Sequence, residues 1–155
     1  MNGIKRINIV NEDFASLVKL LDQYLVIVDG EDHAFYHQYN NIDAFKYIVL
    51  FYKNNVAIAC GAIKVYDAKT MEIKRMFTIA TERQNGIASK ILNELEKWAK
   101  ELLYEKCILE TGAKQIEAIQ FYKKNGYDLI PNFGQYRGII NSRCFKKRIA
   151  VDHQH

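Results

Sequence analysis

The sequence predicts an α/β protein of the α+β type, and three observations support this fold class. Segments with the two-residue period of strands alternate with segments that have the 3.6-residue period of helices. The chain has 155 residues, 49% of them hydrophobic and 26% charged, which suits one globular domain with a proper core. No repeat, linker or low-complexity segment interrupts it. We therefore predict a single domain over residues 1–150, followed by a flexible tail, 151–155.

The first half predicts a strand, a helix and a three-stranded antiparallel meander. Asn11 is a helix N-cap candidate, because it precedes apolar residues at helical spacing from Phe14 to Leu25. Two polar turns, NN and DAKT, separate the meander strands. The predicted strands cover residues 3–10, 46–52, 56–66 and 71–78.

The second half predicts helices and strands in alternation. Apolar residues recur at i, i+4 spacing from Ile87 to Leu103, so we expect an amphipathic helix there. CILET (107–111) is the next strand, and a second helix covers 113–126 with Gly126 at its C-terminal cap. NSRCFKKRI (141–149) is the last strand.

Composition and charge argue against several classes of function. The net charge of +4 arises in residues 79–155, but the basic residues are dispersed, so we predict no nucleic-acid partner. We found no signal-peptide pattern and no apolar run long enough for a membrane span, which predicts a cytoplasmic protein without a membrane partner. The cysteines at 60, 107 and 144 are expected to be reduced core thiols.

The segment RQNGIASK (83–90) places one glycine between a polar turn and the long helix. The first N–H groups of a helix lack intrahelical partners and lie at the positive end of its dipole. Gly86 lets a ligand approach the backbone, Ala88 keeps the next turn narrow, and Arg83 adds a cation. This junction predicts an anion site, and a phosphate ester is the expected ligand.

The pattern R-x-x-G-x-A follows the strand MEIKRMFT and precedes both the long helix and EAIQFYKKNGY. In this combination the chain resembles the GCN5-related N-acetyltransferases (GNAT) from residue 4 to about residue 149. The resemblance implies the GNAT fold, with a mixed, mostly antiparallel central sheet of six to seven strands flanked by about four helices. It also implies that acetyl-CoA binds as cosubstrate, without a metal. The implied cofactor-binding residues are Met76, Phe77 and Thr78 beside the pantetheine arm, Arg83, Gln84, Asn85, Gly86, Ile87, Ala88 and Ser89 around the pyrophosphate, and Tyr122.

The resemblance also implies catalytic residues. Ala118, Tyr122, Gly126 and Tyr127 fit the family segment A-x-x-x-Y-x-x-x-G-[FY], in which the tyrosine faces the departing CoA sulfur. A phenol with a pKa of roughly 10 suits the protonation of a thiolate, so Tyr122 is the candidate general acid. The alternative is that Tyr122 only completes a core stripe.

The attacking amine needs a base, and two strand carboxylates are candidates. Glu72 matches the position of the base in the histone-acetylating branch of the family, and Glu110 ends the following strand. Water is a third alternative, because Glu72 lies beside Lys74 and Arg75 and such a glutamate also forms structural ion pairs.

The polar, aromatic-rich segment after the first helix lies where the family builds its substrate wall. Its acidic residues are expected to attract a cationic amine, and its aromatic residues are expected to form apolar walls; a solvated turn is the alternative. His33 and His37 have helical i, i+4 spacing, but the segment offers no further ligand set, so we predict no metal. The candidate substrate-binding residues are Glu31, Asp32, Phe35 and Tyr36.

Together these features predict an N-acetyltransferase that moves the acetyl group of acetyl-CoA to a primary amine of a small molecule or an exposed residue. Direct attack in a ternary complex is the expected mechanism. The alternative is a non-catalytic acyl-CoA-binding sensor or interaction module of the same fold. The identity of the acceptor, the use of a longer acyl-CoA and the formation of a homodimer stay open.

Overall fold

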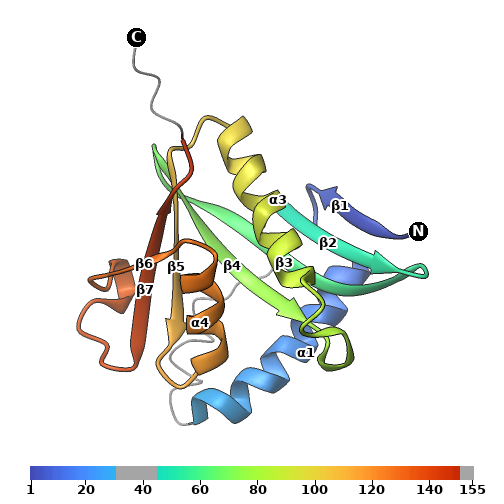
Figure 1. Ribbon diagram of the computed structural model, residues 1–155, viewed down its shortest axis with the longest axis horizontal. Coiled ribbons are helices and arrows are strands. Elements are labelled where there is room, and N and C mark those ends of the chain that lie inside the picture. The colour runs from blue at the N-terminus through green and yellow to red at the C-terminus, as the bar shows by residue number, and fades with distance from the viewer. Residues whose placement is uncertain (31–44, 151–155) are drawn as a thin grey trace. The chain divides into compact units, whose positions relative to one another are not determined.

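The computed structural model describes residues 1–30 and 45–150. Hydrogen bonds join seven strands in the order β1-β2-β3-β4-β5-β7-β6, and most of the pairs are antiparallel (Figure 1). This confirms the predicted fold class and the predicted mostly antiparallel sheet. The strands are β1 (Gly3–Ile7), β2 (Tyr47–Lys53), β3 (Val56–Asp67), β4 (Thr70–Thr78), β5 (Lys106–Gly112), β6 (Asp128–Ile130) and β7 (Ser142–Arg148). The α-helices within the described residues are α1 (Glu12–Asp29), α3 (Ile87–Glu101) and α4 (Ile116–Lys124).

The chain divides into two compact units. Unit 1 comprises Met1–Lys64 and Ile73–Leu95, and unit 2 comprises Val65–Glu72 and Glu96–His155. The strand β4 and the helix α3 therefore each supply residues to both units.

In unit 1, one face of the sheet packs against α1. The helix begins as predicted, because the Asn11 side chain accepts a hydrogen bond from the backbone N–H of Phe14 at 2.9 Å. The pairs Ile48↔Ala62 and Leu50↔Cys60 place these side chains on one face of β2 and β3. They form one buried cluster with the apolar residues of α1, which include Phe14, Leu17 and Val18.

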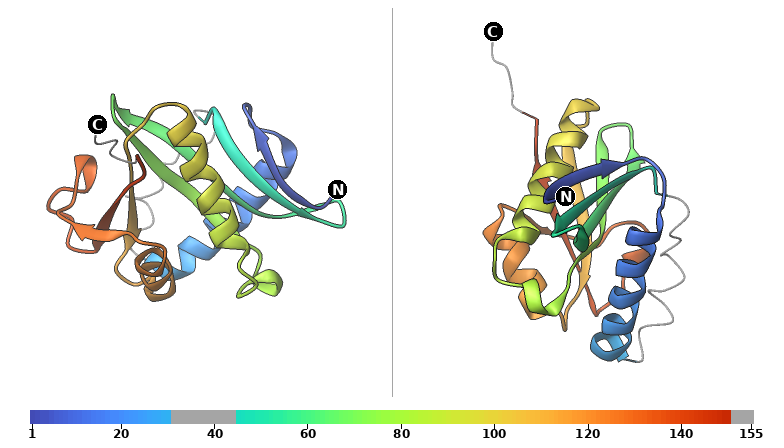
Figure 2. Two further views of the ribbon diagram at one scale, coloured as in Figure 1. Left: turned by 45° about the horizontal axis from the view of Figure 1, so that its top comes forward. Right: turned by 90° about the vertical axis from the view of Figure 1, so that its right-hand side faces the viewer.

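The opposite face of the same strands packs against the first part of α3. A Cβ atom on Gly61 would lie 2.6 Å from Met76 Sδ, 2.8 Å from Ile91 Cγ2 and 2.9 Å from Leu95 Cδ1. Only glycine therefore allows α3 to approach β3 this closely. Figure 2 shows α1 and the first part of α3 on opposite sides of the β1–β2–β3 strands.

The predicted turn between β2 and β3 is confirmed. Asn54 and Asn55 have φ values of 51° and 67°. Two consecutive left-handed residues are typical of a type I′ hairpin turn, in which asparagine is one of the favoured residues. The sequence NN thus sets the pairing next to the turn, Lys53↔Val56 and Tyr52↔Ala57, and an irregularity between Phe51 and Tyr52 shifts the register beyond it.

Unit 2 centres on β5, which pairs in parallel with β4 and antiparallel with β7 (Figure 1). The parallel pairing joins Thr70–Glu72 to residues 106–108. The short strand β6, which pairs with β7, was not predicted. The helix α4 begins at Ile116 and ends at Lys124, so it is shorter than the predicted 113–126, and Gly126 follows it with a φ of 91°.

The end of α3 generates a prediction about stability. Leu103 has a φ of 71° although its side chain is 85% exposed. Its N–H donates to the Lys100 carbonyl at 3.0 Å, and the N–H of Tyr104 donates to the Ala99 carbonyl at 3.0 Å, which is the Schellman pattern that favours glycine. We expect Leu103→Gly to raise the free energy of unfolding by about 0.5–1 kcal/mol, measured by urea denaturation.

Lys97→Gly is the matched control, because Lys97 is exposed and lies inside α3. This substitution should lower the free energy of unfolding by about 1 kcal/mol. Equal losses in both variants would show that the left-handed backbone at Leu103 carries no strain.

Candidate functional site

In unit 1 the connection from β4 to α3 turns through left-handed residues. A 3-10 helix, Ala80–Glu82, is followed by Gln84 with a φ of 68° and Gly86 with a φ of 76°. The backbone N–H of Lys90 donates to the carbonyl oxygen of Gly86 at 3.2 Å, so the helical hydrogen bonds begin at Gly86. The N–H groups of the first turn therefore have no partner inside the helix and lie at the positive end of its dipole. They belong to Ile87, Ala88 and Ser89.

Gly86 borders open space. A Cβ atom at this position would meet no atom within 4 Å, in contrast to the crowded Gly61. The glycine is therefore required by its left-handed backbone, and the space beside it is available to a ligand. Such a turn at a helix start presents several N–H groups to one anion.

Contacts with the rest of unit 1 hold this turn. Lys53 Nζ lies 3.0 Å from Glu82 Oε1. Arg83 Nε donates to the Thr78 carbonyl at 3.0 Å, and its guanidinium lies 5.3 Å from the centre of the Tyr24 ring and 5.8 Å from that of Phe77. Arg83, predicted as a cation at the rim of the site, therefore also fastens the turn to β4 and α1.

The strand that leads into this turn contains a conformational irregularity. Arg75 has a φ of 59°, which is uncommon for a residue with a side chain and rare inside a strand. Arg75 Nη1 lies 2.8 Å from Asp22 Oδ1 on α1, and the Cys60 thiol donates to the Arg75 carbonyl at 3.3 Å. Burial raises the pKa of Cys60 to about 12, so this donor keeps its proton. These contacts fix the backbone immediately before Met76, Phe77 and Thr78, which are all half-buried.

In unit 2 the two predicted base candidates lie together. The β4–β5 register pairs Glu72 with Ile108, and the β5–β7 register pairs Glu110 with Cys144, so both carboxylates are on one face of the strands. Burial, followed by the charges of Glu110 and Glu72, raises the pKa of Tyr136. Burial and the charges of the same two carboxylates also raise the pKa of Cys144, to about 11. The cluster therefore joins two carboxylates, a phenol and a thiol.

Tyr122, the candidate general acid, lies on α4 in unit 2 and is 8% exposed. Its ring meets Phe121 and Tyr127 edge-on, with centroid distances of 5.2 Å and 5.8 Å. Burial raises its pKa, so the phenol is neutral at physiological pH and is a hydrogen-bond donor.

Two buried polar residues of unit 2 were missed by the sequence reasoning. Tyr136 follows β6 in a segment without periodicity, which gave no signal for its burial. Glu96 did carry a signal, because it lies in the apolar stripe of α3, four residues after Leu92 and three before Ala99. A charged residue in such a stripe indicates a buried ion pair.

Several predictions concern residues outside those described. The predicted substrate wall, with Glu31, Asp32, Phe35 and Tyr36, lies there, as do His33 and His37. Over residues 1–30 and 45–150, no group of three or more His, Cys, Asp or Glu side chains is arranged to hold a metal ion. No helix in those two ranges has the length and apolar character needed to cross a membrane.

The comparisons with known proteins agree with this geometry. The model of the acetyltransferase (GNAT) family matches residues 14–127, and the chain belongs to this family. It is 33% identical over 92 residues to the uncharacterized N-acetyltransferase YsnE of Bacillus subtilis strain 168; this stretch is 58% of the chain and 61% of that relative. The chain thus spans about three fifths of the length of this curated relative.

Solved structures share the fold. A Klebsiella pneumoniae protein provisionally named an acyl-CoA N-acyltransferase superposes with a TM-score of 0.80 and 24% identity, over 97% of this chain and 99% of that one. The PaiA N-acetyltransferase of Thermoplasma acidophilum, solved in complex with coenzyme A, has a TM-score of 0.68 and 17% identity, over 94% and 98% of the two chains. At these identities the likeness establishes the GNAT fold.

Proposed function

We propose that this protein transfers the acetyl group of acetyl-CoA to a primary amine of a small molecule or an exposed residue, by direct attack in a ternary complex. The observation that carries the proposal is the start of α3, where Gly86 has a φ of 76° and open space beside it. Unit 1 then binds the pyrophosphate through the first backbone N–H groups of the helix. Met76, Phe77 and Thr78 face the pantetheine arm.

In the transfer the amine nitrogen attacks the thioester carbonyl carbon, the C–N bond forms and the C–S bond breaks. The proton lost by the amine goes to a carboxylate of unit 2, Glu72 or Glu110, or to water. The departing sulfur receives a hydrogen bond or a proton from Tyr122. The neutral phenol supports this role, and the shared face of Glu72 and Glu110 supports a base among them.

Cofactor binding is the first test. Acetyl-CoA at about 100 times its Kd should stabilise the native protein by about 2.7 kcal/mol if it binds only that state. Gly86→Glu should abolish this response in a thermal-shift titration, because it adds bulk and a negative charge at the phosphate position.

Gly138→Glu is the matched control for this test. Gly138 has a φ of 75° and, like Gly86, no atom within 4 Å of the position of a Cβ atom. The two substitutions therefore impose similar backbone strain and the same charge. The Gly138→Glu variant should keep the thermal response to acetyl-CoA. Equal loss of the response in both variants would contradict the proposal that the turn at Gly86 binds the pyrophosphate.

The second test concerns Tyr122. Tyr122→Phe keeps the edge-on ring contacts with Phe121 and Tyr127 and removes only the hydroxyl. We expect kcat to fall by about 100-fold, with the Kd of acetyl-CoA nearly unchanged. If chemistry is rate-limiting, an unchanged kcat would show that the Tyr122 hydroxyl takes no part in the reaction and that the residue is structural.

The third test separates the two carboxylates through the pH dependence of kcat/KM. If Glu72 is the base, Glu72→Gln should lower kcat/KM by about 100-fold and remove its acidic limb. Glu110→Gln should keep the limb and move it to lower pH, because a neighbouring negative charge disfavours ionisation of Glu72. The reverse pattern would make Glu110 the base. Wild-type pH profiles in both variants would leave water as the acceptor of the amine proton.

A further inference from the structure

A buried polar network in unit 2 takes no direct part in the proposed reaction. The hydroxyl of Tyr127, a residue that is 2% exposed, donates to Glu96 Oε2 at 2.8 Å. Lys147 Nζ donates to the other carboxylate oxygen, Glu96 Oε1, at 2.9 Å. Glu96 belongs to α3, Lys147 belongs to β7, and Tyr127 follows α4. The two hydrogen bonds to Glu96 therefore connect α3 with β7 and with the end of α4.

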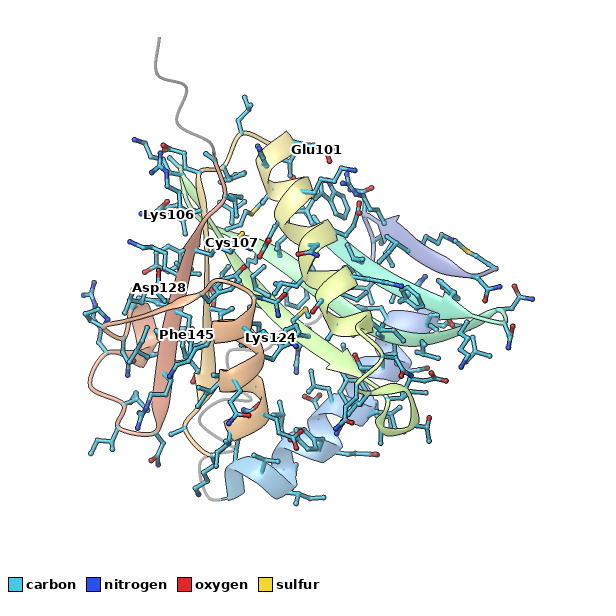
Figure 3. The ribbon with its side chains drawn as sticks, viewed as in Figure 1. Glu101, Lys106, Cys107, Lys124, Asp128 and Phe145 are labelled. Atoms are coloured by element: carbon cyan, nitrogen blue, oxygen red, sulfur yellow. The ribbon has the colours of Figure 1, made fainter. Side chains whose placement is uncertain are left out.

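The network continues into the strand beneath it. Cys107, labelled in Figure 3 on β5, pairs in register with Lys147. Burial, followed by the charge of Glu96, raises the pKa of Cys107 to about 12, and the Tyr127 hydroxyl lies within hydrogen-bonding reach of its sulfur. Tyr127 is therefore surrounded by a carboxylate, an ammonium and a neutral thiol.

Tyr127 is also attached to Tyr122. The N–H of Tyr127 donates to the carbonyl of Tyr122 at 3.0 Å, and the two rings meet at an interplanar angle of 70°. Gly126, which directly precedes Tyr127, has a left-handed conformation, and the Cε atom of Lys147 lies 3.4 Å from the position that a Cβ atom of Gly126 would take. The Lys147 ammonium also lies 5.7 Å from the centre of the Tyr127 ring. The Tyr122 ring thus meets, in an edge-on contact, a ring whose hydroxyl is bonded to Glu96 and which lies beside the Lys147 ammonium.

We propose that Glu96, Tyr127 and Lys147 are positioning residues that hold the Tyr122 phenol in the orientation its acid role requires. This inference rests on the proposed function. A general acid acts over a heavy-atom distance of about 2.6–3.2 Å, and a displacement of about 1 Å costs on the order of 100-fold in rate. The ring contacts of Tyr122 with Phe121 and Tyr127 set that orientation.

The chemistry of the network favours positioning over simple stabilisation. Burying a carboxylate and an ammonium costs solvation free energy that their attraction often only balances, and apolar residues of similar volume frequently stabilise a core as well or better. Directed hydrogen bonds instead define one geometry. Tyr127 combines a packing contact with a directed hydrogen bond, because its ring packs against Tyr122 and its hydroxyl donates to Glu96.

A double-mutant cycle on kcat tests the proposal. Tyr127→Phe keeps the ring and removes the bond to Glu96; we expect kcat to fall by about 10-fold while the KM for acetyl-CoA stays within about 2-fold. In the Tyr122→Phe background the same change should alter kcat by less than about 2-fold, because no hydroxyl is left to position. Tyr66→Phe is the control, since this ring of unit 2 packs edge-on against Phe133, and its kcat should be that of the wild type.

Glu96→Gln and Glu96→Leu form a second pair of variants. Glutamine still accepts from Tyr127 and should retain most of kcat, whereas leucine should reproduce the loss seen in Tyr127→Phe. Circular dichroism at the assay temperature shows whether each variant is folded. If Tyr127→Phe does not fold, the glutamine and leucine variants carry the test.

The outcomes separate the two proposals. Wild-type kcat in Tyr122→Phe would overturn the acid role and the positioning role together. A slow Tyr122→Phe variant with wild-type kcat in Tyr127→Phe, or with fully additive losses in the double variant, would overturn only the positioning role.

Discussion

Unit 1 depends on one constraint, which is that the chain must enter α3 without filling the space beside Gly86. The residues before the helix meet this constraint through left-handed backbone at Gln84 and Gly86. Such a turn is conformationally costly, and the contacts of Glu82 with Lys53 and of Arg83 with Thr78 stabilise it. The close approach of α3 to β3 at Gly61 then fixes the helix whose first N–H groups are proposed to bind the pyrophosphate.

Unit 2 places its polar residues on two different faces of the same strands. Glu72 and Glu110 lie on one face of β4 and β5, together with Tyr136 and Cys144. Cys107 belongs to the other face, because side chains alternate along a strand, and it lies beside the Glu96–Tyr127 hydrogen bond. The alternation separates the carboxylates proposed to accept a proton from the network proposed to orient a donor. A one-residue slip in register would exchange the two sets.

The sequence was most informative where local chemistry decides the backbone. The Asn11 cap and the NN turn involve neighbours in sequence and are found as predicted. The apolar stripe of α3 is buried as far as Ala99, but the helix ends at Glu101, and Leu103, predicted within the stripe, is exposed. The misses concern distant partners. Three residues of β6 carry no period, the left-handed Arg75 contacts Asp22 and Cys60, and Tyr136 is buried near Glu72 on β4 and Glu110 on β5. Glu96 was recognisable as a charge in an apolar stripe, but its partners Tyr127 and Lys147 follow it by 31 and 51 residues.

The burial of Tyr122 bears on its proposed role as an acid. It raises the pKa of the phenol, which keeps the proton in place throughout the physiological range. Transfer from a phenol with a pKa of roughly 10 to a thiolate with a pKa of roughly 8.5 is uphill by about 2 kcal/mol. Tyr122 would therefore act chiefly by donating a hydrogen bond as negative charge develops on sulfur. Such stabilisation is strong only when the donor is oriented before the reaction. In the proposed role, rigid packing around the Tyr122 ring therefore matters more than the acidity of its hydroxyl.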